Sequence, residues 1–225
     1  MLLTILFMSK KAIVFGASGL VGANLVELLL EHPEYREVEI FTRKRSQFSH
    51  DKLKEKITPF QNIHEELKSI NGDTIFFCIG TTIKKAGSKE VMTRIDQEIP
   101  NEIAQIASKN GVKTFALVSS IGANPNSRTY YTKLKGETEN LIKTQFPTKH
   151  IIARPSLLLG ERSEFRLGEL ISKGLFKALS WSFVGPLKRY KGIQARDVAK
   201  ALIRFDLKCK FGTFESDVVR SNANS

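Results

Sequence analysis

Residues 11–22 have the sequence KAIVFGASGLVG, in which an apolar run leads into three glycines and then into an amphipathic segment. The apolar run predicts a buried parallel strand, and the segment after the glycines predicts a helix. In such a loop Gly16 permits a tight exit from the strand, Gly19 lets the backbone approach a pyrophosphate, and Gly22 lets the helix pack on the sheet. The alternative is a glycine-rich loop without a ligand. Because a strand precedes the loop and a helix follows it, we expect a dinucleotide site here.

The overall charge raises the question of nucleic acid. The chain has 225 residues, a net charge of +12 and a pI near 9.7, and its length fits one large α/β domain. Its Lys and Arg residues are spread along the sequence, however, and no zinc-finger or RNA-recognition signature accompanies them. An anionic small ligand together with a solvated basic surface therefore explains the charge better than nucleic acid does.

Strand patterns alternate with helix patterns along the chain. Such alternation indicates βαβ units, a parallel sheet and right-handed crossovers. We therefore expect an α/β fold with a doubly wound parallel sheet, as a single domain over residues 8–225, with a small C-terminal substrate cap over 156–220 and a start-site extension over 1–7. After the first unit, the predicted strands are 37–42, 57–60, 73–80, 114–119 and 149–153. The predicted helices are 64–70, 89–109 with a kink or break at Pro100, 130–146, 164–179 and 196–203.

The end of the second predicted strand bears on cofactor choice. In an NAD-binding unit, an Asp or Glu about 20 residues after the glycine loop accepts a hydrogen bond from the ribose 2′-OH. Here that place holds Arg43, followed by Lys44 and Arg45. A guanidinium suits a 2′-phosphate and offers no acceptor to a 2′-OH. The alternative is a solvated basic loop; the pattern favours NADP.

A Ser-Ser strand end and a Tyr-x-x-x-Lys helix start carry the candidate chemistry. Tyr131 and Lys135 are four residues apart, so on a helix they share a face. A neighbouring ammonium stabilises a phenolate, which suits a tyrosine to proton transfer with a carbonyl or hydroxyl oxygen. A serine hydroxyl at the preceding strand end can hold that oxygen, and either Ser119 or Ser120 could face the site. Tyr-x-x-x-Lys alone is common by chance, but here it follows the glycine loop and the Ser-Ser pair.

Taken together, these motifs resemble one known group. Besides the glycine loop and the Ser-Ser and Tyr-x-x-x-Lys pairs, the matching features are Gly80-Thr-Thr, Lys85-Ala-Gly87, Gly122-Ala-Asn124, Gly136-Glu137 and Arg154-Pro155. The chain looks like an atypical short-chain dehydrogenase/reductase, in particular the branch of the Tat-interactive-protein oxidoreductase, over about residues 11–170.

The resemblance implies a Rossmann fold that binds NADPH, with Tyr131 as proton donor or acceptor. It further implies that Lys135 holds the nicotinamide ribose and tunes Tyr131, and that Ser120 orients the substrate. Where the animal member of that group has a polar pair, this chain has Leu20-Val21, so contacts to phosphate there come from the backbone. The implied cofactor-binding residues, with those of the glycine loop, are Gly16, Ser18, Gly19, Leu20, Val21, Gly22, Arg43, Lys44, Ile79, Gly80, Tyr131, Lys135, Leu158 and Arg166.

The sequence thus predicts an NADPH-dependent oxidoreductase acting on a small carbonyl or hydroxyl substrate. The alternatives are a non-catalytic NADPH-binding regulatory protein and a nucleotide-sugar epimerase-like enzyme. Neither the two cysteines nor the four histidines have metal-ligand spacing, so no metal is expected. The apolar opening is too short for a signal h-region or a membrane span, which favours a cytoplasmic protein without membrane partners. Both a monomer and a homodimer are compatible with the sequence.

Overall fold

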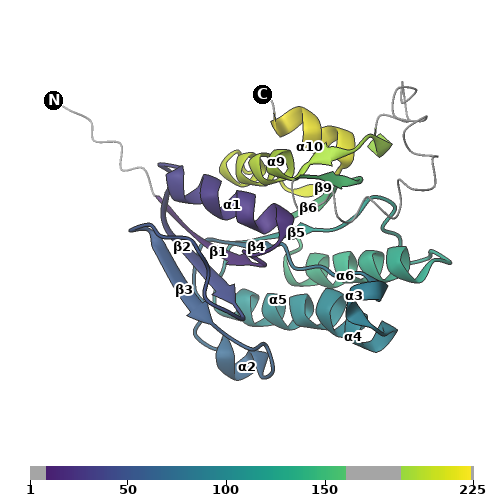
Figure 1. Cartoon of the computed structure of the whole chain (residues 1–225), viewed down its shortest axis with the longest axis horizontal. Helices are drawn as coiled ribbons and strands as arrows, with labels where there is room; N and C mark the ends of the chain where they lie inside the picture. Colours follow the sequence, from purple (N-terminus) through teal and green to yellow (C-terminus); the bar gives the residue numbers. More distant parts are fainter. Residues whose placement is uncertain (1–8, 161–188, 224–225) are drawn as a thin grey trace.

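The computed structural model describes residues 9–160 and 189–223, and a parallel sheet of seven strands lies at its centre (Figure 1). The strands are β1 Lys10–Phe15, β2 Tyr35–Thr42, β3 Leu53–Ile57, β4 Thr74–Phe77, β5 Thr114–Val118, β6 His150–Arg154 and β9 Gly212–Glu215. Their order is β3-β2-β1-β4-β5-β6-β9, and each neighbouring pair is parallel. This arrangement confirms the doubly wound α/β fold. The order reverses between β1 and β4, where ligands bind in such sheets.

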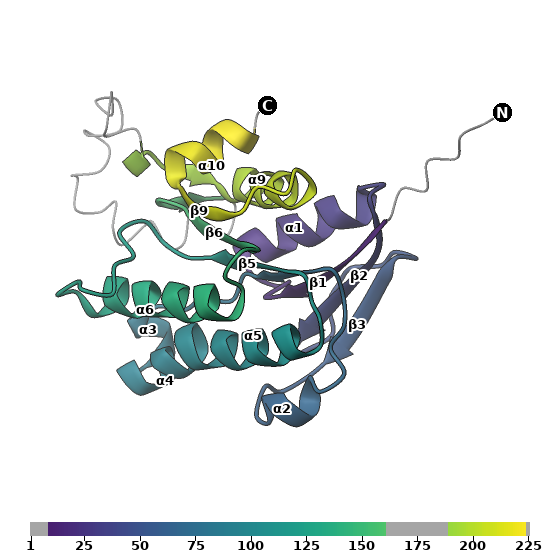
Figure 2. The same ribbon diagram turned by 180° about the vertical axis from the view of Figure 1, so that it is seen from behind.

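Helices cover both faces of the sheet (Figures 1 and 2). One face carries α1 Leu20–Glu31 and α9 Ala195–Leu207, and α10 Ser216–Ala223 packs on α9. The opposite face carries α2 Ile63–Glu66, α5 Ile99–Lys109 and α6 Tyr130–Gln145. The short helices α3 Ile83–Ala86 and α4 Lys89–Thr93 follow β4 and lead into α5.

The buried strand β1 divides its side chains between two cores. Ala12 and Val14 lie in the core beneath α1 and α9, whereas Ile13 and Phe15 lie in the core beneath α5 and α6. All four side chains are fully buried. Since successive residues of a strand point to opposite faces, a strand covered on both sides reads as a continuous apolar run. That is why the run before the glycines was a strong strand signal.

The predicted helix over 89–109 is interrupted. A π-helical turn, η1 Arg94–Glu98, separates α4 from α5, and Pro100 is in the first turn of α5. Proline has no N–H and cannot donate to the carbonyl four residues earlier, which is that of Asp96. That carbonyl accepts a hydrogen bond from the Thr138 hydroxyl of α6 at 3.0 Å. The expected break at the proline is therefore a widened turn just before it.

The expected strand over 57–60 was wrong, because the third strand is β3, over Leu53–Ile57. β3 is an edge strand with the sequence LKEKI, and Phe60 has a positive φ of 57°. Edge strands often carry charged residues and lack the apolar run of a central strand. The helix expected over 64–70 covers only Ile63–Glu66.

The C-terminal region contributes to the sheet itself. Strand β9 pairs with β6 as the seventh strand, and α9 packs against α1. A separate two-stranded pair joins β7 Leu158–Leu159 to β8 Ile193–Gln194. The helix expected over 164–179 lies outside the described residues, so a substrate cap within 156–220 stays a prediction.

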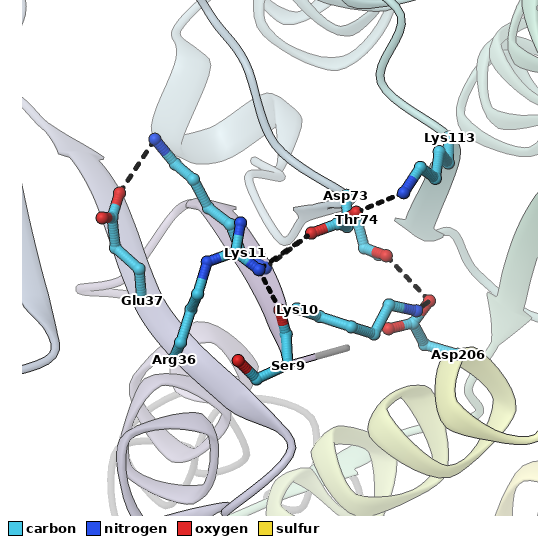
Figure 3. A network of polar contacts seen from close by, with 9 residues as sticks. All are labelled: Ser9, Lys10, Lys11, Arg36, Glu37, Asp73, Thr74, Lys113 and Asp206. Atoms are coloured by element: carbon cyan, nitrogen blue, oxygen red, sulfur yellow. Dashed lines mark hydrogen bonds and ion pairs between the residues drawn. The ribbon is translucent and has the colours of Figure 1, made fainter. Parts of the chain in front are cut away.

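A polar network ties the elements together at the amino edge of the strands (Figure 3). The carboxylate of Asp206 is fully buried and accepts hydrogen bonds from Lys10 at 2.6 Å, Tyr35 at 2.6 Å and Thr74 at 2.8 Å. Burial, followed by the charge of Asp206, raises the pKa of Tyr35 far above its usual value. This network fastens the end of α9 to β1, β2 and β4, at the edge opposite the glycine loop.

Candidate cofactor and catalytic site

The glycine loop at the carboxyl end of β1 is packed too tightly for side chains. Gly16 has a φ of +89°, and a Cβ there would lie 2.8 Å from the backbone of Cys78 and Ile79. A Cβ on Gly22 would lie 2.1 Å from the carbonyl oxygen of Gly16. The Gly19 N–H donates to the Gly16 carbonyl at 2.9 Å, which closes the turn before α1. The first and third glycines thus bring helix, loop and sheet together.

The N-terminus of α1 begins directly after this loop. Gly19 is its N-cap residue and supplies no side-chain cap, and no acidic residue lies in the first turn. The first amides of a helix carry a partial positive charge and suit an anion. The side chain of Val21 is buried in the core, while Ser18 is exposed. A Cβ on Gly160 would lie 2.9 Å from Leu20, so the end of β7 approaches this loop, and Leu158 lies half-buried in β7.

Two exposed cations, Arg43 and Lys44, follow β2 beside β1. The Glu55 carboxylate of β3 shapes their turn by accepting hydrogen bonds from the Ser46 N–H at 2.7 Å and the Thr42 hydroxyl at 3.4 Å. Although burial acts in the opposite direction, these hydrogen bonds lower the pKa of Glu55. Within residues 9–160 and 189–223, neither Arg43 nor Lys44 pairs with a carboxylate. Both cations therefore remain available to an anion.

The Tyr-x-x-x-Lys pair lies at the start of α6, with Gly80 facing it. The Nζ atom of Lys135 lies 5.9 Å from the centre of the Tyr131 ring. A Cβ on Gly80 would lie 3.6 Å from the same Nζ, so the chain after β4 passes directly over the lysine. Lys135 is buried, and Tyr131 is half-buried. The structure thus brings Gly80, Tyr131 and Lys135 together, as the motifs predicted, while Ile79 joins Gly80 to the tight contact with Gly16.

The two serines after β5 have different surroundings. Ser119 is buried, and its hydroxyl donates to Glu139 of α6 at 2.6 Å. Glu139 also accepts two hydrogen bonds from Arg154, at 2.9 and 2.6 Å. These hydrogen bonds are the main reason why the pKa of the Arg154 guanidinium is raised. Ser120 is half-buried, and among residues 9–160 and 189–223 its hydroxyl makes only a long contact of 3.4 Å, to the Ile121 carbonyl. Ser119 is thus engaged in a structural network with the Arg-Pro motif, whereas Ser120 can reorient towards a ligand.

One buried group at this site was missed by the sequence reasoning. Asp96 of η1 is fully buried, its Oδ1 atom lies 3.5 Å from Lys135 Nζ, and Oδ1 also accepts from the Thr81 N–H at 3.1 Å. Burial raises the pKa of Asp96, although Lys135 acts in the opposite direction. A charged residue on an otherwise apolar helical face, four residues before Pro100, was the available signal.

One expected site residue, and the question of a metal or a membrane-spanning helix, complete the comparison of the candidate site with the sequence. Arg166 lies outside the described residues. No group of three or more His, Cys, Asp and Glu side chains is placed to hold a metal ion within 9–160 and 189–223. In the same residues, no helix has the length and apolarity that crossing a membrane requires.

The parallel sheet, the glycine loop and the open helix N-terminus define a nucleotide-binding Rossmann fold. A family model described as "NAD dependent epimerase/dehydratase family" matches residues 12–205, and the chain belongs to this family. A nicotinamide nucleotide is accordingly its cofactor class. The matching Rossmann fold is also seen in the Bordetella bronchiseptica enzyme WbmH in complex with NAD+, with a TM-score of 0.70 at 16% identity over 92% of this chain and 75% of that one.

Two curated relatives identify the branch of the family that this chain resembles. The chain is 35% identical over 213 residues to "Protein FMP52, mitochondrial" of Candida albicans, covering 92% of both proteins. It is 30% identical over 180 residues to "Protein HTATIP2" of Rattus norvegicus, covering 77% of this chain and 74% of that protein. These relatives confirm the likeness to the atypical short-chain dehydrogenase/reductases.

The FMP52 relatives correct one expectation. The Candida albicans protein and further FMP52 relatives are named mitochondrial. The expectation of a cytoplasmic protein was therefore wrong. It rested on an opening too short for a signal h-region or a membrane span, and that test does not distinguish the cytosol from a mitochondrion.

Proposed function

We propose that the protein is an NADPH-dependent oxidoreductase that acts on a small carbonyl or hydroxyl substrate, with Tyr131 as proton donor or acceptor. The observation that carries this proposal is the placement of Tyr131 and Lys135 on one face of α6, with Lys135 Nζ 5.9 Å from the tyrosine ring and next to Gly80. The residues lie near the carboxyl ends of β4 and β5, where a doubly wound sheet binds its ligand.

The residues around the glycine loop fit a dinucleotide cofactor. The tight turn at Gly16 and Gly22, and the approach left open at Gly19, suit a pyrophosphate over the N-terminus of α1. We assign the phosphate contacts to backbone amides around Ser18, Gly19, Leu20 and Val21, because the side chain of Val21 is buried. In this proposal Ile79 and Gly80 line the adenosine side, and Leu158 and Arg166 complete the site.

Cofactor preference would come from Arg43 and Lys44. A 2′-phosphate adjacent to two cations that lack carboxylate partners in the described part of the chain gains charge-assisted hydrogen bonds, whereas a 2′-OH gains little. A bound nicotinamide would supply or accept a hydride. The chain's own groups would then orient the substrate oxygen, through the Ser120 hydroxyl, and move one proton at that oxygen, through the Tyr131 phenol.

Within this scheme Lys135 has two tasks. Its ammonium would donate hydrogen bonds to the nicotinamide ribose, and its positive charge would stabilise the phenolate of Tyr131. We infer a single domain over 8–225, with a small C-terminal substrate cap within 156–220. An epimerase-like reaction is the second candidate, because the matching family includes epimerases.

A screen with purified protein tests the proposed function. NADPH and NADH are titrated by fluorescence, and a panel of aldehydes, ketones and quinones is then offered with the preferred cofactor. Net consumption of NADPH with at least one carbonyl compound supports an oxidoreductase. Conversion of a nucleotide sugar with no net change in cofactor favours the epimerase. Tight NADPH binding without turnover of either class contradicts the catalytic proposal.

The names of the FMP52 relatives lead us to infer a mitochondrial location for this chain. Fractionation of cells that express the complete coding sequence, followed by protease protection of the isolated organelles, tests this. Recovery in the soluble cytosolic fraction contradicts it.

A further inference from the structure

A pocket lies at the amino edge of the strands, on the opposite edge of the sheet from the glycine loop. Its volume is about 570 Å³, which is within the range of small-molecule sites. Its walls come from the starts of β1, β2, β4 and β5 and from the end of α9. None of its lining residues belongs to the proposed cofactor or substrate site, so a ligand here is independent of the proposed function.

The buried side of this pocket is electrically balanced. The carboxylate of Asp206 is fully buried and already accepts hydrogen bonds from Lys10, Tyr35 and Thr74. Because three protein donors satisfy this carboxylate, it has no need of a partner from a ligand. Recognition of a ligand would therefore depend on the more exposed lining residues.

Two half-exposed cations, Arg36 of β2 and Lys113 before β5, share the carboxylate of Asp73 (Figure 3). Lys113 Nζ lies 2.7 Å from Asp73 Oδ1, and Arg36 Nη1 lies 3.9 Å from Asp73 Oδ2. The side chains of Arg36 and Lys113 are 57% and 56% exposed, whereas that of Asp73 is only 17% exposed. The solvent-facing charge of this cluster is thus positive, which favours an anionic group.

Both cations keep hydrogen-bond donors for such a group. Arg36 uses only Nη1, which donates to the Ser9 carbonyl and faces Asp73. Within residues 9–160 and 189–223, the Nε and Nη2 atoms of Arg36 make no hydrogen bond, and Lys113 uses one of its three N–H donors. A guanidinium edge with two parallel donors suits a carboxylate, and a neighbouring ammonium adds a third donor.

The pocket also contains a carboxylate that lacks a partner. Glu34 is half-buried, and its backbone carbonyl accepts from the Lys10 N–H at 2.7 Å, which fixes it beside β1. In the described part of the chain, the Glu34 carboxylate makes neither an ion pair nor a hydrogen bond. A half-buried carboxylate of this kind favours a cationic group with N–H donors.

We propose that this pocket binds a small zwitterion of the α-amino acid type. Its carboxylate would bind Arg36 and Lys113, and its ammonium would bind Glu34. A zwitterion uses the free donors and the free acceptor together and leaves the net charge of the pocket unchanged. A simple anion would leave Glu34 unpaired next to added negative charge, and a simple cation would face the two exposed cations.

Calorimetric titration of the purified protein with each of the twenty protein amino acids tests the proposal. We expect at least one of them to bind. Its decarboxylated amine and its deaminated acid should bind at least about tenfold more weakly, because each loses a charge-assisted contact. Inorganic phosphate serves as the simple anion. Absence of binding by all twenty amino acids, or equally tight binding of phosphate or of the deaminated acid, overturns the proposal.

Variants of the lining residues identify the groups that hold the ligand. Arg36→Gln and Glu34→Gln should each weaken binding of the amino acid at least about tenfold. Arg196→Gln is the matched control, since Arg196 is 48% exposed and pairs with Glu27 of α1, away from this pocket. It should bind as wild type does. Should Arg36→Gln fail to fold, Lys113→Gln replaces it; wild-type affinity in the folded variant overturns the proposal.

The thiol of Cys209 reports where the ligand binds, because Cys209 is exposed and lines the pocket. A bound amino acid should slow alkylation of Cys209 by iodoacetamide in proportion to occupancy, as measured by mass spectrometry of the Cys209 peptide. Saturating NADPH should not displace the ligand, since the cofactor site is at the opposite edge of the sheet. Unchanged alkylation, or displacement by NADPH, places the ligand elsewhere and overturns the proposal. A protein that binds no NADPH but still binds the amino acid contradicts only the proposed function.

Discussion

The Lys135 ammonium lies 5.9 Å from the centre of the Tyr131 ring, one helical turn earlier on α6. Because the two residues are four apart on a helix of 16 residues, their relative placement is set by the backbone of α6 alone. The tertiary structure adds the third neighbour, since the chain after β4 brings Gly80 to the same lysine. Local helix geometry therefore positions Tyr131 and Lys135 relative to each other, and the sheet places this pair where a cofactor would bind.

The exposed cations after β2 predict a preference for NADPH. We expect NADPH to bind at least about tenfold more tightly than NADH, which corresponds to about 1.4 kcal/mol. Replacing Arg43 and Lys44 together by Ala should abolish this preference, and raising the salt concentration should reduce it, since both cations are exposed. Lys113→Ala, at the opposite edge of the sheet, should leave the preference unchanged. Equal affinities of wild type for the two cofactors would contradict the assignment.

The glycine loop predicts that binding and folding respond to different glycines. At Gly19 a Cβ would lie 3.2 Å from the Gly16 carbonyl, which a small shift can relieve, so Gly19→Val should fold. Its side chain would occupy the approach of the pyrophosphate and abolish NADPH binding. At Gly22 a Cβ would lie 2.1 Å from that carbonyl, so Gly22→Ala should lower the melting temperature strongly. Calorimetry with circular dichroism separates the effects; a folded Gly19→Val protein with wild-type affinity would show that the loop is purely structural.

The carboxylate of Asp73 predicts a defined acid dependence of stability (Figure 3). Burial acts to raise the pKa of Asp73. Hydrogen bonds from Lys113 at 2.7 Å and from the Lys11 N–H at 2.8 Å outweigh burial and lower this pKa below its ordinary value of 3.8. A lowered pKa means that the stabilisation is present above the unfolded-state pKa and is lost as the pH falls through the folded-state pKa.

We therefore expect wild type to exceed Asp73→Asn in free energy of unfolding by a constant amount between about pH 7 and pH 5. The difference should shrink only below the ordinary pKa of 3.8. Urea denaturation of both proteins across this range measures it. A difference that already disappears between about pH 7 and pH 5 would assign the effect to another group.

Much of the fold and of the candidate site could be predicted because their signals are local. A strand buried on both faces reads as an apolar run, and the contact between Gly22 and the Gly16 carbonyl explains why the loop needs its glycines. The pair of Tyr131 and Lys135 needs only helix periodicity. These features depend on residues close together in the sequence, so a sequence pattern contains them.

The features that sequence reasoning missed depend on distant partners. The role of Ser119 is set by Glu139, which is 20 residues away, and that contact leaves Ser120 as the more available serine. The environment of Asp96 depends on a π-helical turn in which its own carbonyl accepts a hydrogen bond from Thr138, 42 residues further along the chain. The edge strand β3 has charged residues where a central strand would be apolar, so its pattern did not identify it.

The central claim is that the Tyr131 phenol transfers the proton, and its neighbour provides the control. Tyr130 is also at the start of α6, but its hydroxyl is engaged with Thr93 at 2.6 Å and with the Lys89 carbonyl at 2.7 Å. Both tyrosines are changed singly to Phe, and NADPH affinity and turnover of the best carbonyl substrate are measured for each folded variant. Tyr131→Phe should bind NADPH nearly as wild type does but lose turnover by about 10²-fold or more, because only the proton transfer is removed. Tyr130→Phe should retain wild-type turnover. If Tyr131→Phe turns over substrate at the wild-type rate, the assignment of Tyr131 is contradicted.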